Sequence, residues 1–118
     1  MKLTDLDAHF MTFDVGPIEE HWPQGRPSHR YVETLAEADG VWFLCPKCFA
    51  ANGGEVGTHL VGCWFVGKVP EWASPGPGRW NPSGTGLHDL TFVPPGAVSV
   101  LLTAGWGWHG FVKNGDAA

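Results

Sequence analysis

The sequence has little charge and no run of basic residues. Only 16% of its 118 residues are charged, and 12 acidic against 7 basic residues give a formal net charge of −5. Proteins that bind duplex nucleic acid depend on Lys and Arg contacts to the phosphates. The composition therefore predicts a protein that does not bind duplex nucleic acid.

Long apolar segments are missing as well. A helix that crosses a bilayer needs about 20 consecutive apolar residues, and no segment approaches that length. The opening residues, Met1 to Asp5, lack the basic-then-apolar order of a signal peptide. We therefore expect no membrane association and a location in a cytoplasm.

Cysteine is scarce, and all three cysteines lie in one short stretch. Cys45 and Cys48 form a Cys-x2-Cys knuckle, and Cys63 follows fifteen residues later. Such a knuckle places two thiolates near the separation that tetrahedral Zn²⁺ requires, and a third soft ligand fits a structural site. An odd number of cysteines favours metal-bound thiolates in a reducing compartment over disulfides. The pattern predicts one structural Zn²⁺.

The fourth ligand is expected to be a histidine, either His59 or His109. On a regular strand His59 and Cys63 would lie about 13 Å apart, at a rise of about 3.3 Å per residue, which is too far for one ion. His109 has no such restriction, and glycines on either side of it leave room for close backbone approach. We predict the ligands Cys45, Cys48, Cys63 and His109, with His59 as the alternative.

Glycine and proline are abundant, and they indicate the fold class. The chain has 17 Gly and 10 Pro, so turns must be frequent and long helices are not expected. We predict a mainly β protein: a small single-domain antiparallel sheet of about six strands, stapled by the zinc knuckle, with long Pro/Gly-rich loops and little helix. Residues 1–40 would supply an N-terminal strand and a long irregular excursion, and residues 41–118 the zinc-stapled β part. The later strands are expected at 41–44, 58–66, 87–93, 98–103 and 108–113.

Seven tryptophans are a large number for a chain of this length. One interpretation is core packing and the anchoring of loops. The other is a binding surface or a small pocket, because tryptophan is common in ligand and partner sites. The candidates for such a surface are Trp72, Trp80, Trp106 and Trp108.

Several short motifs follow one another in the second half of the chain. They are Cys45-Pro46-Lys47-Cys48, Trp80, Gly84-Thr85-Gly86, Asp89-Leu90-Thr91-Phe92, Pro95, Ser99-Val100 and Trp108-His109-Gly110-Phe111-Val112-Lys113-Asn114-Gly115. This order resembles the DUF6527-like family of small phage and prophage proteins over about residues 41–116. The resemblance implies a phage or prophage origin and a zinc-bound fold, without an activity. It also implies that Trp106 stands where some relatives carry a metal-binding Cys or His, and that Cys63 serves instead.

Three functions follow as hypotheses. The first is a non-catalytic zinc-binding accessory protein of a phage or prophage, which binds a host or virion protein in the bacterial cytoplasm or in the virion. The second is a small-ligand domain with a tryptophan cage, similar to the zinc-bearing β-tent domains but without their second knuckle. The third is a zinc-dependent hydrolase with an open metal site, for which no nearby carboxylate is evident. We favour the first and therefore expect no enzyme activity.

Overall fold

The computed structural model describes residues 1–103 and 105–118, and it confirms a mainly β protein with little helix. One short α-helix and two 3-10 turns accompany the strands. The elements are η1 (Leu3–Asp5), β1 (His9–Val15), β2 (Pro27–Val32), η2 (Leu35–Glu37), β3 (Gly40–Leu44), α1 (Pro46–Asn52), β4 (Leu60–Trp64), β5 (Asn81–Ser83), β6 (Thr91–Val93), β7 (Ser99–Leu102), β8 (Trp108–Lys113) and β9 (Asp116–Ala117).

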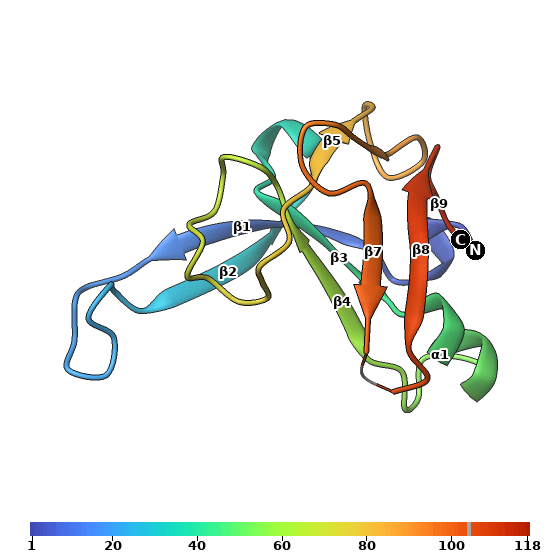
Figure 1. Ribbon diagram of the computed structural model, residues 1–118, viewed down its shortest axis with the longest axis horizontal. Helices are drawn as coiled ribbons and strands as arrows, with labels where there is room; N and C mark the ends of the chain where they lie inside the picture. Colours follow the sequence, from blue (N-terminus) through green and yellow to red (C-terminus); the bar gives the residue numbers. More distant parts are fainter. Residues whose placement is uncertain (104) are drawn as a thin grey trace.

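The largest sheet has four antiparallel strands in the order β2-β1-β3-β4. Its β1–β2 hairpin is long and projects from one end of the molecule, while α1 lies at the other end (Figure 1). β1 pairs with β3 from His9 opposite Trp42 to Met11 opposite Gly40. The first forty residues therefore contribute two strands, β1 and β2, to the same sheet as the strand that leads to the knuckle.

Two smaller sheets complete the fold. β5 pairs with β6, and β7, β8 and β9 form a three-stranded sheet that contacts β6. The core lies between these strands and the inner face of the four-stranded sheet, where Phe43 meets Trp108 edge to face with ring centroids 6.0 Å apart. Apolar burial of this kind is the main force that holds such a small domain together.

The structure differs from the expectation in the region 15–39, where the density of Gly and Pro predicts little regular structure. β2 forms there and begins at Pro27. Proline is tolerated at the first residue of an edge strand because its missing N–H costs no ladder hydrogen bond, and β2 is at the edge of its sheet. Pairing with β1 makes this segment a strand despite its neighbouring Gly and Pro residues, which lie at or before the start of β2.

A second difference is the helix that contains the knuckle. Asn52-Gly53 is hairpin-like in sequence, but Asn52 ends α1 and Gly53 is its C-cap with φ of 70°. Glycine adopts this left-handed conformation without a Cβ penalty. Pro46 at the start of α1 is equally favourable, because the first helical position has no intrahelical N–H bond to lose.

Candidate metal centre

The knuckle lies where β3 ends and α1 begins. Cys45 follows β3 and is the N-cap residue of α1, and its carbonyl accepts the first helical hydrogen bond, from the Phe49 N–H at 2.9 Å. Cys48 lies in the first turn of the helix and is 2% exposed, while Cys45 is fully buried. The start of the helix therefore holds both thiols inside the protein, close to each other.

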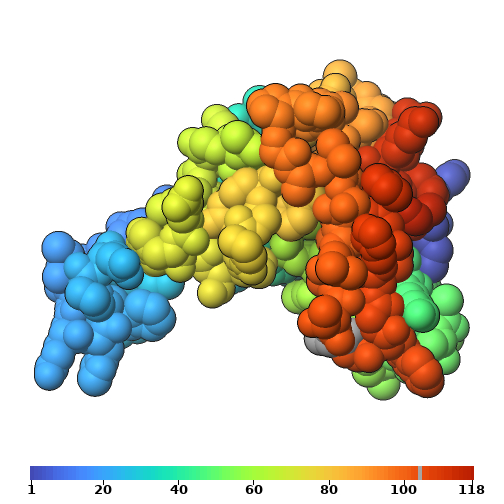
Figure 2. All heavy atoms as spheres, viewed as in Figure 1, coloured from blue at the N-terminus to red at the C-terminus, as the bar shows by residue number. Residues whose placement is uncertain are grey.

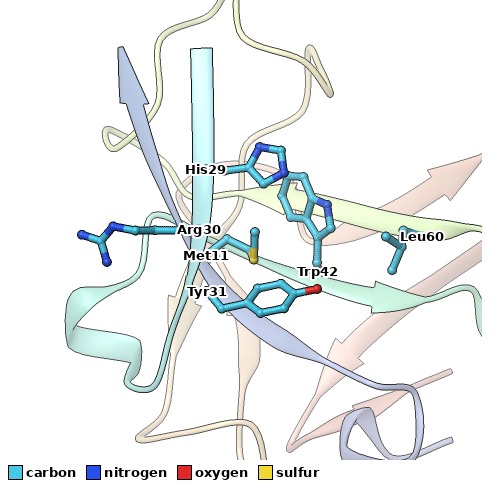
Figure 3. Close-up of a pocket in the computed structure, with 6 residues that line it drawn as sticks. All are labelled: Met11, His29, Arg30, Tyr31, Trp42 and Leu60. Atoms are coloured by element: carbon cyan, nitrogen blue, oxygen red, sulfur yellow. The ribbon is translucent and has the colours of Figure 1, made fainter. Parts of the chain in front are cut away.

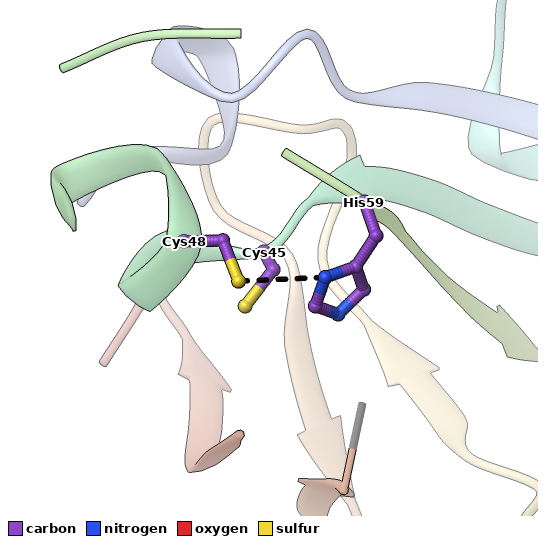
Figure 4. A group of neighbouring side chains, drawn as sticks. All are labelled: Cys45, Cys48 and His59. Atoms are coloured by element: carbon purple, nitrogen blue, oxygen red, sulfur yellow. Dashed lines mark hydrogen bonds between the residues drawn. The ribbon is translucent and has the colours of Figure 1, made fainter. Parts of the chain in front are cut away.

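His59 lies beside this knuckle, one residue before β4. The Cys45 N–H donates to the His59 carbonyl at 2.9 Å, which extends the β3–β4 pairing by one step. The imidazole Nδ1 is 3.4 Å from the Cys48 sulfur, and the ligand atoms of Cys45, Cys48 and His59 all lie within 4.8 Å of one another (Figure 4). A sulfur and a nitrogen bound to one tetrahedral Zn²⁺ lie about 3.6 Å apart, from bond lengths of about 2.3 and 2.0 Å. The three side chains thus fit one ion.

The two ring nitrogens of His59 have different surroundings. Nε2 is buried and has no hydrogen-bond partner among residues 1–103 and 105–118. A metal bound at Nδ1 would leave Nε2 as the N–H donor, and an unpaired buried polar atom costs about 1–3 kcal/mol. Among those residues only Nδ1 has a hydrogen-bonding neighbour, and the neighbour is a cysteine sulfur. The ring is oriented toward the thiols.

Gly105, between β7 and β8, approaches the side chains of Cys48 and His59. A Cβ built on Gly105 would lie 3.0 Å from the Cys48 sulfur and 3.1 Å from His59 Nδ1, and Gly105 has φ of 59°. Only glycine combines this conformation with so close an approach. The C-terminal hairpin therefore reaches the metal centre, as its glycines suggest, but it does so with backbone.

Cys63 and His109 lie outside this cluster. Cys63 pairs with Val41 in the middle of β4 and is fully buried in the core. Val41 precedes Cys45 by four residues, which is about 13 Å along a strand. His109 is exposed on β8, where its ring lies 6.3 Å from that of Phe111.

Strand spacing still forbids a site shared by His59 and Cys63, as the sequence indicates. The structure, however, separates Cys63 from the knuckle and keeps His59 beside it. The reason is that β4 begins only at Leu60, so that His59 is opposite Cys45. Of the four predicted ligands, two are brought together, and the alternative histidine joins them.

The thiols of Cys45 and Cys63 are both buried, but they have different surroundings. Burial raises the pKa of the Cys45 thiol, whereas hydrogen bonds from the backbone N–H groups of Cys48 and Lys47 lower it in part. It also raises the pKa of the Cys63 thiol, which has no opposing contact. Since metals bind the thiolate, an ion at Cys45 must displace a proton. Cys63 packs as a small apolar side chain.

The four tryptophans named as a binding surface do not form one. Trp108 is 9% exposed and packs in the core, and the indole N–H of Trp80 donates to the Ser99 carbonyl at 3.0 Å. Trp106 is 63% exposed near the β7–β8 turn, whereas Trp72 is 38% exposed in the segment that follows β4. The four tryptophans therefore lie in at least three separate parts of the structure.

Sequence reasoning missed a different aromatic group, on the outer face of the four-stranded sheet. Strand alternation places Phe13, His29, Trp42 and Trp64 on this face, opposite to the core. Figure 3 shows His29 beside Trp42 there, with Tyr31 on the other side of Met11. The sequence signal for this face is partial, because His29 and Tyr31 alternate on β2 whereas Trp42 is adjacent to Phe43 on β3 and Trp64 is the one aromatic residue of β4.

Comparisons with protein families, with curated proteins and with solved structures give no match. None of the helices described here has the length and apolar character that a membrane span requires. Function is therefore inferred from the geometry of the protein itself.

Proposed function

We propose that this protein is a non-catalytic, zinc-stapled β module that binds another protein. The observation that carries the proposal is the cluster of the buried Cys45 and Cys48 with the partly buried His59, where β3, α1 and the start of β4 meet and Gly105 approaches. Following the family resemblance, we place it among phage or prophage accessory proteins, with a host or virion protein as its partner.

The donor set supports zinc as the ion. Two thiolates and one imidazole are the ligands of structural Zn²⁺ sites, whereas Mg²⁺ and Ca²⁺ require oxygen. No Asp or Glu oxygen belongs to the cluster in the part of the chain described. Bound zinc would stabilise the fold by connecting the β3–α1 junction to the residue that precedes β4.

A stapling role suits the size of the domain. A chain of 118 residues buries a modest core, and here the strands are distributed over three small sheets. Cys45 and Cys48 belong to the β3–α1 junction. His59 is the last residue of the seven-residue loop 53–59 between α1 and β4. One ion at this point would connect α1 to the start of β4, two elements that share few other contacts.

Exposed aromatic side chains support the binding role. Trp22, Tyr31, Trp72, Trp106 and Phe111 are each at least 38% exposed, and aromatic residues are enriched at protein interfaces. A partner protein would bury part of them.

A zinc-dependent hydrolase is the second candidate, because only three ligands come together among the described residues. Catalytic zinc sites have three protein ligands and a water in the fourth position. A hydrolase also needs a carboxylate or a second histidine to move a proton, and none belongs to the cluster among residues 1–103 and 105–118. We therefore rank this function below the binding module.

Zinc content of purified variants tests the metal centre. We expect about one zinc per chain in the parent, because the cluster forms one tetrahedral set. His59→Ala and Cys48→Ser should lose it after mild chelation, while His109→Ala and Cys63→Ala, which change a histidine and a cysteine outside the cluster, should keep it. Loss in His109→Ala with retention in His59→Ala would reject this ligand set.

Affinity purification from expressing or infected bacteria tests the binding role. The parent should retain a protein at fixed stoichiometry, and a Trp72→Leu or Trp106→Leu variant with normal zinc content should lose it. A zinc-loaded protein that captures nothing, but hydrolyses a substrate in a His59-dependent way, would favour the second candidate.

A further inference from the structure

The outer face of the four-stranded sheet carries a cavity of about 270 Å³ between two loops. One wall is the β1–β2 hairpin with its 16–26 loop, and the other is the segment 66–79 that follows β4. In Figure 2 this segment lies over the front of the molecule and faces the hairpin. The lining residues are Phe13, Trp22, Pro27, His29, Trp64, Trp72 and Ser74.

Ring planes in this cavity stand nearly at right angles. Phe13 meets Trp64 at 76° with centroids 5.6 Å apart, and it meets Trp72 at 67° with centroids 5.8 Å apart. Trp22 comes from the opposite loop and is 40% exposed. Four aromatic side chains from three parts of the chain therefore surround one space, which we call the aromatic cage.

The base of the cage is fixed before any ligand arrives. Trp64 is 1% exposed, and its indole N–H donates to the Ser74 carbonyl at 3.0 Å. Val69 and Ala73 pack in the same cluster as Trp64. A preformed cavity loses little conformational entropy on binding, which is a property of small-molecule sites.

The charge around the cage favours a cation. No Lys or Arg lines it, and the chain carries a net charge of −5. Arg79 belongs to the segment 66–79 but lines a different cavity. Its guanidinium donates to backbone carbonyls, including those of Pro70 and Gly78. An anionic ligand would find no Lys or Arg in the lining, and His29 is its one titratable side chain.

We propose that the aromatic cage binds a methylated ammonium group. The negative faces of several rings attract such a cation, and its methyl groups fill an apolar space that a hydrated ammonium would not enter. The group could belong to a methylated lysine of a protein partner or to a free quaternary amine. The first source rests on the proposed binding function, and neither source requires the metal centre.

Titration of the intact protein with a cation and its neutral isostere tests the proposal. Tetramethylammonium and choline should shift the tryptophan fluorescence and the indole N–H resonances saturably. The neutral analogue 3,3-dimethylbutanol, of the same shape as choline, should bind roughly tenfold more weakly, because it lacks the cation–π attraction. Equal binding of the two would show a merely apolar pocket and overturn the proposal.

Variants assign the binding to the cage. Trp72→Leu and Trp22→Leu, at two partly exposed positions, should weaken choline binding, and Trp106→Leu should leave it unchanged. Zinc content and melting temperature serve as checks of folding for each variant. Absence of saturable binding to the folded parent, or binding unaffected by both cage variants, would overturn the proposal whether or not the zinc site holds.

A peptide series separates the two sources of the ligand. A trimethyl-lysine peptide should bind more tightly than its unmodified form if the ligand is a partner's side chain, and no better than free choline if it is a small amine. Failure of the cage would leave the zinc content untouched, so the two proposals can fail separately.

Discussion

Asp89 holds the turn that precedes β6 through hydrogen bonds to its carboxylate. The N–H groups of Thr85 and Gly86 donate to it at 2.8 and 2.9 Å, and the Thr85 hydroxyl donates at 2.8 Å. These contacts lower the pKa of Asp89 to about 2. Donors of this kind favour the ionised carboxylate, so the turn is stabilised by its charge.

The pH dependence of stability should reveal this carboxylate. Its folded pKa lies below the unfolded value of about 3.9, so its contribution is complete above about pH 4 and is lost as the pH falls toward 2. We expect Asp89→Asn to be less stable than the parent at pH 7 and to approach it near pH 2. Urea unfolding of both proteins at each pH measures the difference, and thiol protonation affects both alike. A difference that stays constant with pH would contradict this account.

The metal centre shows which residues can be identified from sequence and which cannot. The Cys45/Cys48 knuckle is local, and its spacing alone indicates that the two thiols lie together. The histidine depends on where β4 begins, and a shift of one or two residues decides whether His59 is inside the strand or beside Cys45. The first residue of β4 is set by its pairing with β3, and no local pattern in the sequence indicates where that pairing begins.

At the scale of the element, Gly40 permits β3 and β4 to pair. It is opposite Trp64, and a Cβ at this position would lie 2.5 Å from the indole and 2.8 Å from the Cys63 carbonyl. Both neighbours are fixed, because Trp64 is buried and the carbonyl is backbone. The strand therefore depends on the absence of one methyl group.

Gly40→Ala should consequently destabilise the protein by about 1–3 kcal/mol, the usual cost of overpacking. The matched control is Gly16→Ala, where the new Cβ would meet nothing closer than 3.4 Å and φ is not in the left-handed region. We expect that control to be neutral or slightly stabilising. Thermal unfolding compares the two, and equal melting temperatures would refute the role of Gly40.

Elements differ in how well their sequences predict them. The apolar run from Val41 to Leu44 and the segment from Trp108 to Lys113 predict strands close to the observed β3 and β8. β2 is not evident in the same way. It is an edge strand with several polar residues, and it forms a strand because it pairs with β1. The helix α1 is short, and its Pro46 and Gly53 boundaries are clear only once the helix is known.

At the scale of the whole molecule, the metal should couple to stability. Ligands of a zinc site are not preorganised in an unfolded chain, so binding free energy adds to folding free energy. Chelation of the parent should lower its melting temperature by more than about 10 °C, since each kcal/mol shifts a domain of this size by several degrees. His59→Ala should melt at one temperature with or without chelator. A parent insensitive to chelation would exclude a structural metal.

The overall architecture was predictable only in class. Composition and periodicity indicate antiparallel β structure, and the structure confirms it. They do not indicate that the strands divide into sheets of four, two and three, because that division depends on long-range pairing. It also depends on Phe65 and Trp80, whose bridge connects the edge of the large sheet to β5.

The contact between Trp42 and Trp64 also gives the molecule an optical property. Their ring centroids are 4.5 Å apart and their planes are inclined at 57°. Indoles so close and so inclined couple their electronic transitions, which produces a pair of circular dichroism bands of opposite sign. Because Trp64 also lines the aromatic cage, these bands report on the outer face of the sheet independently of the knuckle.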